Sequence, residues 1–171
     1  MTVVAASTRC TRTRAPPQAR RTLAPCLQGP HVRLQLRNCR LCSNNASGMW
    51  LLGGAAASLA HCALRFNCCN GAACWDSGGS LTLRCCTLDY NAMNGVRVLH
   101  GARGALQGCD IAVTGDSGVE AGSAAAVDVR DCRILGAMHL CYPIAACLAG
   151  AVSDGAPCLV QPLSLTSYNT C

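Results

Sequence analysis

The stretch LTLRCCTLDYNAMNGV, residues 81–96, holds two adjacent cysteines in a run where apolar and polar side chains alternate. Alternation with a period of two is typical of a β-strand, in which neighbouring residues point to opposite faces. Leu83 and Cys86 are three positions apart, so both can face inward only if the chain turns a corner at Arg84 and Cys85. We therefore expect Cys86 to be buried and Cys85 to lie at an exposed corner.

The same pattern recurs at spacings of 23 or 24 residues, which is typical of a solenoid. Each unit has a cysteine, a leucine or isoleucine two positions later and, in most units, an asparagine and a glycine further on. The one 24-residue step lies between Gly71 and Leu83 and marks a turn, because turns accept insertions better than strands do. The cysteine column is Cys39, Cys62, Cys86, Cys109 and Cys132, and the asparagine column is Asn44, Asn67 and Asn91.

Three stretches, LQLRNCRLCSNNASGM (34–49), LTLRCCTLDYNAMNGV (81–96) and VDVRDCRI (127–134), resemble the right-handed parallel β-helix, the pectin-lyase-like superfold. The resemblance implies an all-β, right-handed parallel β-helix solenoid of about five coils, each with about three short strands. It also implies that the cysteine column stacks into a buried ladder and the asparagine column into an inner, hydrogen-bonded ladder. We expect the stacked thiols to be inert packing, because free cysteine behaves as a small hydrophobic residue.

Leucine-rich repeats share the strand signature LxLxxCxL and are the competing interpretation. They need a further leucine at positions that here hold His31, Gly54, Gly78, Gly101 and Ala124. They also need a return segment with its own apolar residues, whereas GVRVLHG and GVEAG are bounded by glycine and alternate. The sequence therefore favours the β-helix.

The non-repetitive ends suggest three regions. We expect a disordered basic leader at residues 1–30, the β-helix at residues 31–137 and a C-terminal cap or irregular tail at residues 138–171. The leader is free of acids, and an organelle (plastid or mitochondrion) transit peptide is its alternative interpretation. Its apolar run is too short for a secretory signal, so we favour an intracellular location, and no apolar run predicts a membrane span. Open strand edges at the solenoid ends would allow end-to-end self-association.

Charge is uneven along the chain, whose net charge is +6. Residues 1–75 hold nine arginines and no acid, and residues 76–171 hold five arginines and eight acids. A basic half is typical of nucleic-acid binding, but here it lacks interleaved aromatic residues and known reader motifs. Nucleic acid is therefore not expected as a partner.

The superfold includes polysaccharide lyases and hydrolases as well as non-catalytic regions of F-box, surface and scaffold proteins, so function must come from the site. Asp89 and Asp110 are weak catalytic candidates, on adjoining coils with about 8 Å between their Cβ atoms, a separation found in inverting glycosidases. Arg65 and Arg133 flank them and complete a candidate binding set. Ion pairing among these four is the simpler interpretation, since the tandem-aspartate and Gly-His-Gly signatures and a calcium-binding carboxylate cluster are missing.

We expect no cofactor and no metal. Cys39 and Cys42 have the spacing of half a zinc knuckle, but an odd offset on a strand points their thiols apart. The sequence favours a non-catalytic β-helix module that presents its strand faces to a protein or polysaccharide partner. A carbohydrate-active enzyme, complete or degenerate, and a fragment of a longer β-helix protein are the alternatives. The disulfide state stays open for Cys68, Cys69, Cys85 and the C-terminal cysteines.

Overall fold

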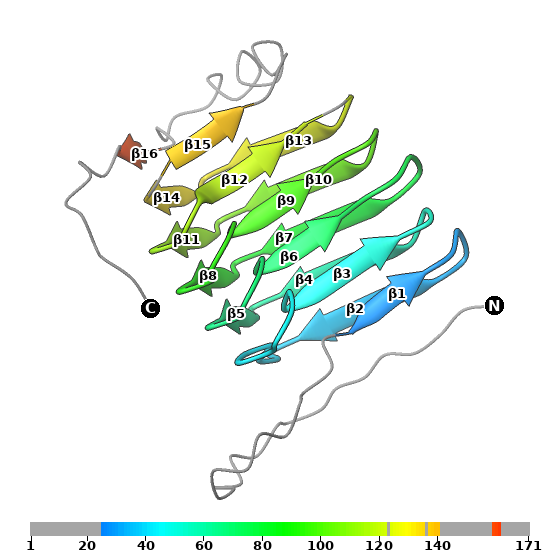
Figure 1. Ribbon diagram of the computed structural model, residues 1–171, viewed down its shortest axis with the longest axis horizontal. Coiled ribbons are helices and arrows are strands. Elements are labelled where there is room, and N and C mark those ends of the chain that lie inside the picture. The colour runs from blue at the N-terminus through cyan, green and yellow to red at the C-terminus, as the bar shows by residue number, and fades with distance from the viewer. Residues whose placement is uncertain (1–24, 123, 136, 141–158, 162–171) are drawn as a thin grey trace, which may run out of the picture.

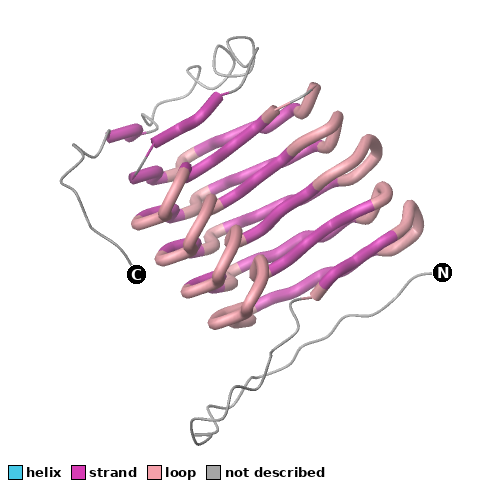
Figure 2. The backbone as a smooth tube through the Cα atoms, in the orientation of Figure 1, coloured by secondary structure: helices cyan, strands magenta, loops and turns pink. Residues whose placement is uncertain are grey.

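The computed structural model describes residues 25–122, 124–135, 137–140 and 159–161. Three parallel sheets wrap around a common core, and successive coils stack along one axis (Figures 1 and 2). The described residues contain no helix, and the segments that connect the sheet A strands form sheets B and C instead of the return segments of a leucine-rich repeat. The β-helix prediction is confirmed, and with it about five coils of three short strands each. The described residues therefore include no helix with the length and apolar character of a membrane span.

Each coil contributes one strand to each sheet, except that the first coil meets sheet C only through an isolated bridge between Arg40 and Ala63. Sheet A is β2 (Arg33–Arg37), β4 (Ala56–Ala60), β7 (Ser80–Arg84), β10 (Arg103–Gln107) and β13 (Ala126–Arg130). Sheet B is β1 (Cys26–Gln28), β3 (Met49–Leu52), β6 (Ala72–Cys74), β9 (Val96–Val98), β12 (Ser117–Ala121) and β15 (Ala137–Leu140). Sheet C is β5 (Ala63–Arg65), β8 (Thr87–Asp89), β11 (Asp110–Ala112), β14 (Arg133–Leu135) and β16 (Leu159–Gln161).

The strand register turns sequence columns into spatial ladders. Leu59, Leu83 and Leu106 pair in sheet A, and Leu64, Leu88 and Ile111 pair in sheet C. These side chains are at most 1% exposed, so the interior of the solenoid is one continuous apolar core. The extra residue lies in the turn between β6 and β7, as its place in the sequence predicts.

The corner between sheets A and C separates the two adjacent cysteines as expected. Cys86 is 1% exposed, whereas Cys85 is exposed and has a left-handed backbone with φ of 49°. The cysteine column is buried throughout, and each thiol donates to the carbonyl oxygen two residues earlier, as in Cys86 to Arg84 O at 3.3 Å.

The asparagine column forms the predicted inner ladder. Asn44 Nδ2 donates to Asn67 Oδ1 at 2.8 Å, and Asn67 Nδ2 donates to Asn91 Oδ1 at 2.9 Å. The glycine column packs against it: a Cβ on Gly71 would lie 2.6 Å from Gly95 O and 2.9 Å from Asn91 Nδ2. Only glycine fits so close an approach of backbones.

The boundary drawn at residue 30 is too late. β1 lies within the segment assigned to the leader and pairs in parallel with β3, with Leu27 opposite Leu51. The two residues are one 24-residue step apart, so the repeat already carried this signal. Residues 1–24, and most of the expected cap or tail at 138–171, lie outside the described residues.

Candidate functional site

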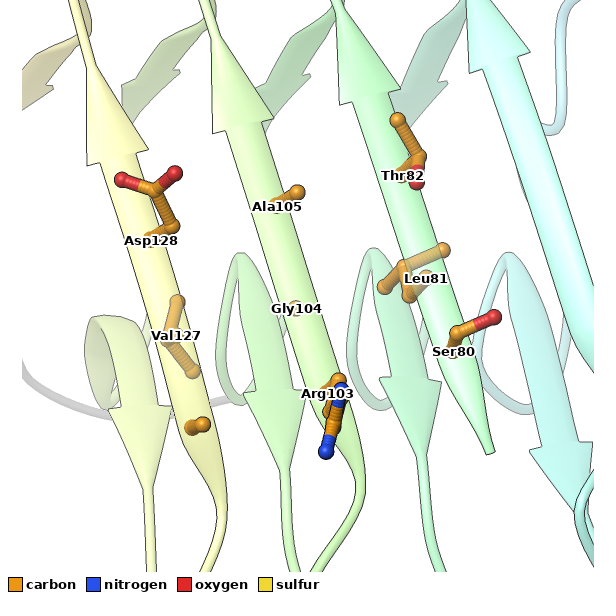
Figure 3. Close-up of a pocket in the computed structure, with 9 residues that line it drawn as sticks. Ser80, Leu81, Thr82, Arg103, Gly104, Ala105, Val127 and Asp128 are labelled. Carbon is orange, nitrogen blue, oxygen red and sulfur yellow. The ribbon is translucent and has the colours of Figure 1, made fainter. Parts of the chain in front are cut away.

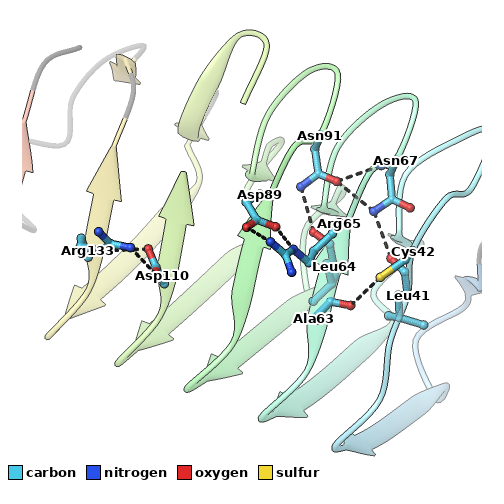
Figure 4. A network of polar contacts seen from close by, with 10 residues as sticks. All are labelled: Leu41, Cys42, Ala63, Leu64, Arg65, Asn67, Asp89, Asn91, Asp110 and Arg133. Atoms are coloured by element: carbon cyan, nitrogen blue, oxygen red, sulfur yellow. Dashed lines mark hydrogen bonds and ion pairs between the residues drawn. The ribbon is translucent and has the colours of Figure 1, made fainter. Parts of the chain in front are cut away.

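The four predicted site residues lie on the outer face of sheet C, where they form two ion pairs (Figure 4). Arg65 stands opposite Asp89 on the next coil and binds it through two nitrogens, with Nη2 to Oδ2 at 2.6 Å. Arg133 stands opposite Asp110 and binds it in the same way, with Nε to Oδ1 at 3.0 Å and Nη2 to Oδ2 at 2.6 Å. Each arginine therefore occupies both oxygens of one carboxylate.

The environments of the two pairs differ. The Asp110 and Arg133 side chains are 41% and 57% exposed, whereas the Asp89 side chain is only 11% exposed, although its position points away from the core. The hydrogen bonds to the carboxylates raise the pKa of both arginines above the ordinary value. Both oxygens of each carboxylate already accept hydrogen bonds from an arginine, so ion pairing accounts for these four residues without a catalytic role.

Sheet B carries a second polar cluster on its outer face. Arg97 Nε lies 2.7 Å from Glu120 Oε2, which also accepts from Asn94 Nδ2 at 2.9 Å. The Arg97 guanidinium lies 5.7 Å from the ring centroid of Trp75, over its face. The Glu120 carboxylate is engaged by both Arg97 and Asn94, whereas the buried Nε1 of Trp75 has no hydrogen-bond partner.

Sheet A has a hollowed outer surface. A shallow depression of about 370 Å³ lies over β7, β10 and β13, and Ser80, Thr82, Arg103, Ala105 and Asp128 help to line it (Figure 3). Two smaller depressions, of about 190 and 180 Å³, extend it towards Arg130 and towards Arg37. Thr82 lines all three, so together they form one groove along the solenoid axis, which we call the sheet A groove.

The sheet A groove is basic. Its strands carry five exposed arginines and one carboxylate, that of Asp128, which forms an exposed ion pair with Arg130 at 3.0 Å. No described acidic residue forms an ion pair with the other four. The arginines are Arg33, Arg37, Arg84, Arg103 and Arg130.

Sequence reasoning missed this surface because only the outward columns after each cysteine were considered. The positions two, four and six residues before each cysteine point outward from sheet A by the same alternation and were equally readable. A second buried ladder, of Ser47, Asn70, Asn94 and Ser117, was also readable, eight positions after each of the first four cysteines of the column.

The described cysteines are all free thiols, and no group of three or more metal-ligating side chains forms within the described ranges. Cys74 is buried in the core, Cys68 is exposed and Cys69 is half-buried in the turn. Burial raises the pKa of Cys74 to about 11. Hydrogen bonds from neighbouring thiols and burial raise the pKa of Cys62 and Cys109 as well.

Residues 28–147 match a protein-family model described as the right-handed β-helix region. No curated protein and no solved structure matches the chain. The matched segment spans most of the chain and agrees with the three-sheet solenoid described above. The chain therefore belongs to the right-handed β-helix family.

Proposed function

We propose that this β-helix is a non-catalytic binding module that holds an acidic polysaccharide in the sheet A groove. The support is the placement of arginine on three successive coils. Arg84 lies at the end of β7, Arg103 at the start of β10 and Arg130 at the end of β13, so the charge alternates between the two edges of the groove.

The spacing suits a polymer that lies along the solenoid axis. Coils follow one another at about 4.8 Å, and the two edges of a five-residue strand lie about 13 Å apart. In a linear uronic-acid polymer whose rings flip by half a turn at each linkage, successive carboxylates point to opposite sides. The carboxylates of such a polymer would face arginines at the two edges of the groove alternately. Arginine binds a carboxylate with two parallel hydrogen bonds.

The floor of the groove complements a sugar chain. Ala105 leaves room for a ring, while Thr82 and Ser58 place hydroxyl groups where they can bond to sugar hydroxyls. Asp128 repels an anion and already engages Arg130, so we expect coils three and four, with Arg84 and Arg103, to contribute most of the affinity.

The test is calorimetric titration of the full chain with polygalacturonate and polymannuronate, with dextran as the neutral polymer. We expect the double variant Arg84→Gln/Arg103→Gln to bind at least ~10-fold more weakly, which corresponds to about 1.4 kcal/mol. The control is Arg40→Gln, which removes one exposed arginine outside the groove, and its loss is compared with that of Arg84→Gln alone, which also removes one.

Three results would contradict the proposal: no binding of either polyuronate, an equal loss in Arg40→Gln, or tighter binding of duplex DNA than of the polyuronates. A loss that follows net charge alone would point to non-specific attraction, which also falls steeply with salt.

A further inference from the structure

The large apolar side chains that are exposed in the described part of the chain all lie along one edge of the solenoid. They stand where the chain leaves β5, β8 and β11 and turns towards sheet B. We call them the apolar edge: Phe66 (54% exposed), Tyr90 (49%), Met93 (37%) and Val113 (51%).

Three of these residues occupy one strained position on successive coils. Phe66, Tyr90 and Val113 have φ of 57°, 53° and 47°, a left-handed conformation that bulky and β-branched residues rarely adopt. The other left-handed corner row holds Asn38, His61, Cys85, Gly108 and Asp131, which are mostly small or polar. The left-handed backbone therefore does not by itself require apolar residues at these positions. Backbone strain of this kind is concentrated at functional sites.

The exposed rings are fixed in place. Phe66 and Tyr90 stack with centroids 5.0 Å apart and planes 11° apart. The Arg65 guanidinium lies over both rings, at 5.7 and 5.9 Å, and is itself held by Asp89. A preformed surface of this kind loses little side-chain entropy when a partner binds.

The size of the apolar edge limits what it can bind. A half-exposed aromatic ring offers about 100 Å², so the four side chains offer a few hundred square ångströms. A stable dimer needs about 800 Å² from each partner. The edge is too small to hold a second copy of the chain, and it suits one short element of a partner.

The spacing of the apolar edge along the solenoid axis indicates which secondary structure of a partner can dock on it. Its side chains recur every ~4.8 Å along the axis, and the apolar stripe of an amphipathic helix recurs every three or four residues, or about 4.5–6 Å. Over two coil spacings, the apolar residues of a helix fall out of register with the row by about 1 Å. The same-face residues of a strand are about 6.7 Å apart and fall out of register by about 4 Å. We infer that the apolar edge docks an amphipathic helix of a partner protein, aligned with the solenoid axis.

The probe is a synthetic, fluorescently labelled amphipathic helical peptide with leucine at every third or fourth position, titrated with the full chain. The comparison peptide has the same composition in an alternating, strand-like order. We expect the helical peptide to bind and Phe66→Asn/Tyr90→Asn to weaken it at least ~10-fold, while the melting temperature stays equal or rises because asparagine tolerates the left-handed backbone.

The matched control is His61→Asn, which changes a left-handed corner on a different edge and should leave peptide binding unchanged. Equal binding by wild type and the double variant would overturn the proposal, as would binding of the strand-like peptide at least as tightly, or no helical binding at about 1 mM. Self-association in sedimentation, or binding to phosphatidylcholine vesicles, that disappears in the double variant would identify a different occupant and overturn it too.

Discussion

Asn91 Oδ1 accepts two hydrogen bonds from Asn67 on the preceding coil, one from Nδ2 at 2.9 Å and one from the backbone N–H at 3.2 Å. Asn91 Nδ2 in turn donates to Leu64 O at 3.0 Å. Both asparagines are 2% exposed, so water cannot replace these bonds. The ladder satisfies buried backbone groups where the chain turns and the strand pairing has ended.

Replacing Asn91 should therefore destabilise the fold strongly. Asn91→Ala removes three buried hydrogen bonds and leaves the Asn67 backbone N–H without its side-chain acceptor, although Asn67 Nδ2 keeps its bond to Leu41 O. Each buried hydrogen bond lost or group left unpaired costs about 1–3 kcal/mol. We expect a loss of at least ~3 kcal/mol in the free energy of unfolding, measured by urea denaturation.

Two further variants calibrate that loss. Asn45→Ala changes an exposed neighbour of the ladder and should stay within about 0.5 kcal/mol of wild type. Asn91→Thr introduces the residue type found at the equivalent Thr114 and should fall between the two. If Asn91→Ala were no more costly than Asn45→Ala, the ladder would not contribute to stability.

The ladders could be predicted from sequence because stacking in register converts a periodic column into a line of contacts. Cys86 and Asn67 needed only the repeat and the two-residue alternation of strands. The arginines of the sheet A groove follow the same two-residue alternation but were not identified from the sequence. The burial of Asp89 and the stacking of Phe66 on Tyr90 depend on side-chain rotamers and on the corner backbone, which the register does not specify.

Thiol labelling should separate Cys85 from Cys86 in the native chain. Thiolate formation and access control cysteine reactivity, and only Cys85 of the two is exposed. We expect a maleimide to modify Cys85, Cys26 and Cys68 rapidly and Cys86 only after unfolding, as mapped by mass spectrometry. Labelling of Cys86 at the rate of Cys85 would contradict the buried ladder.

Alkaline pH should weaken the fold through the buried thiols. The pKa of Cys74 rises from 9.0 to about 11 in the folded chain, so the folded state keeps its proton where the unfolded state loses it. This contribution is fully present below pH ~9 and is lost as the pH rises to about 11, by about 2–3 kcal/mol for this thiol. Urea denaturation at a series of pH values measures the loss.

Cys74→Val provides the control, because Val98 fills the same column one coil later and the core should accept it. The variant should lose less stability than wild type between pH ~9 and ~11. An identical slope in both proteins would mean that Cys74 does not titrate with folding.

The two sheet C aspartates should contribute different amounts to the stability of the fold, and neither should support turnover of a glycan. Asp110→Asn breaks an exposed ion pair and should cost no more than about 0.5 kcal/mol. Asp89→Asn breaks the pair at the less exposed carboxylate and should cost about 1–2 kcal/mol more. Because an arginine clamps both oxygens of each carboxylate, we expect no turnover of pectin-like or other acidic glycans by wild type or by either variant. Turnover by wild type that both substitutions abolish would instead make the pair catalytic.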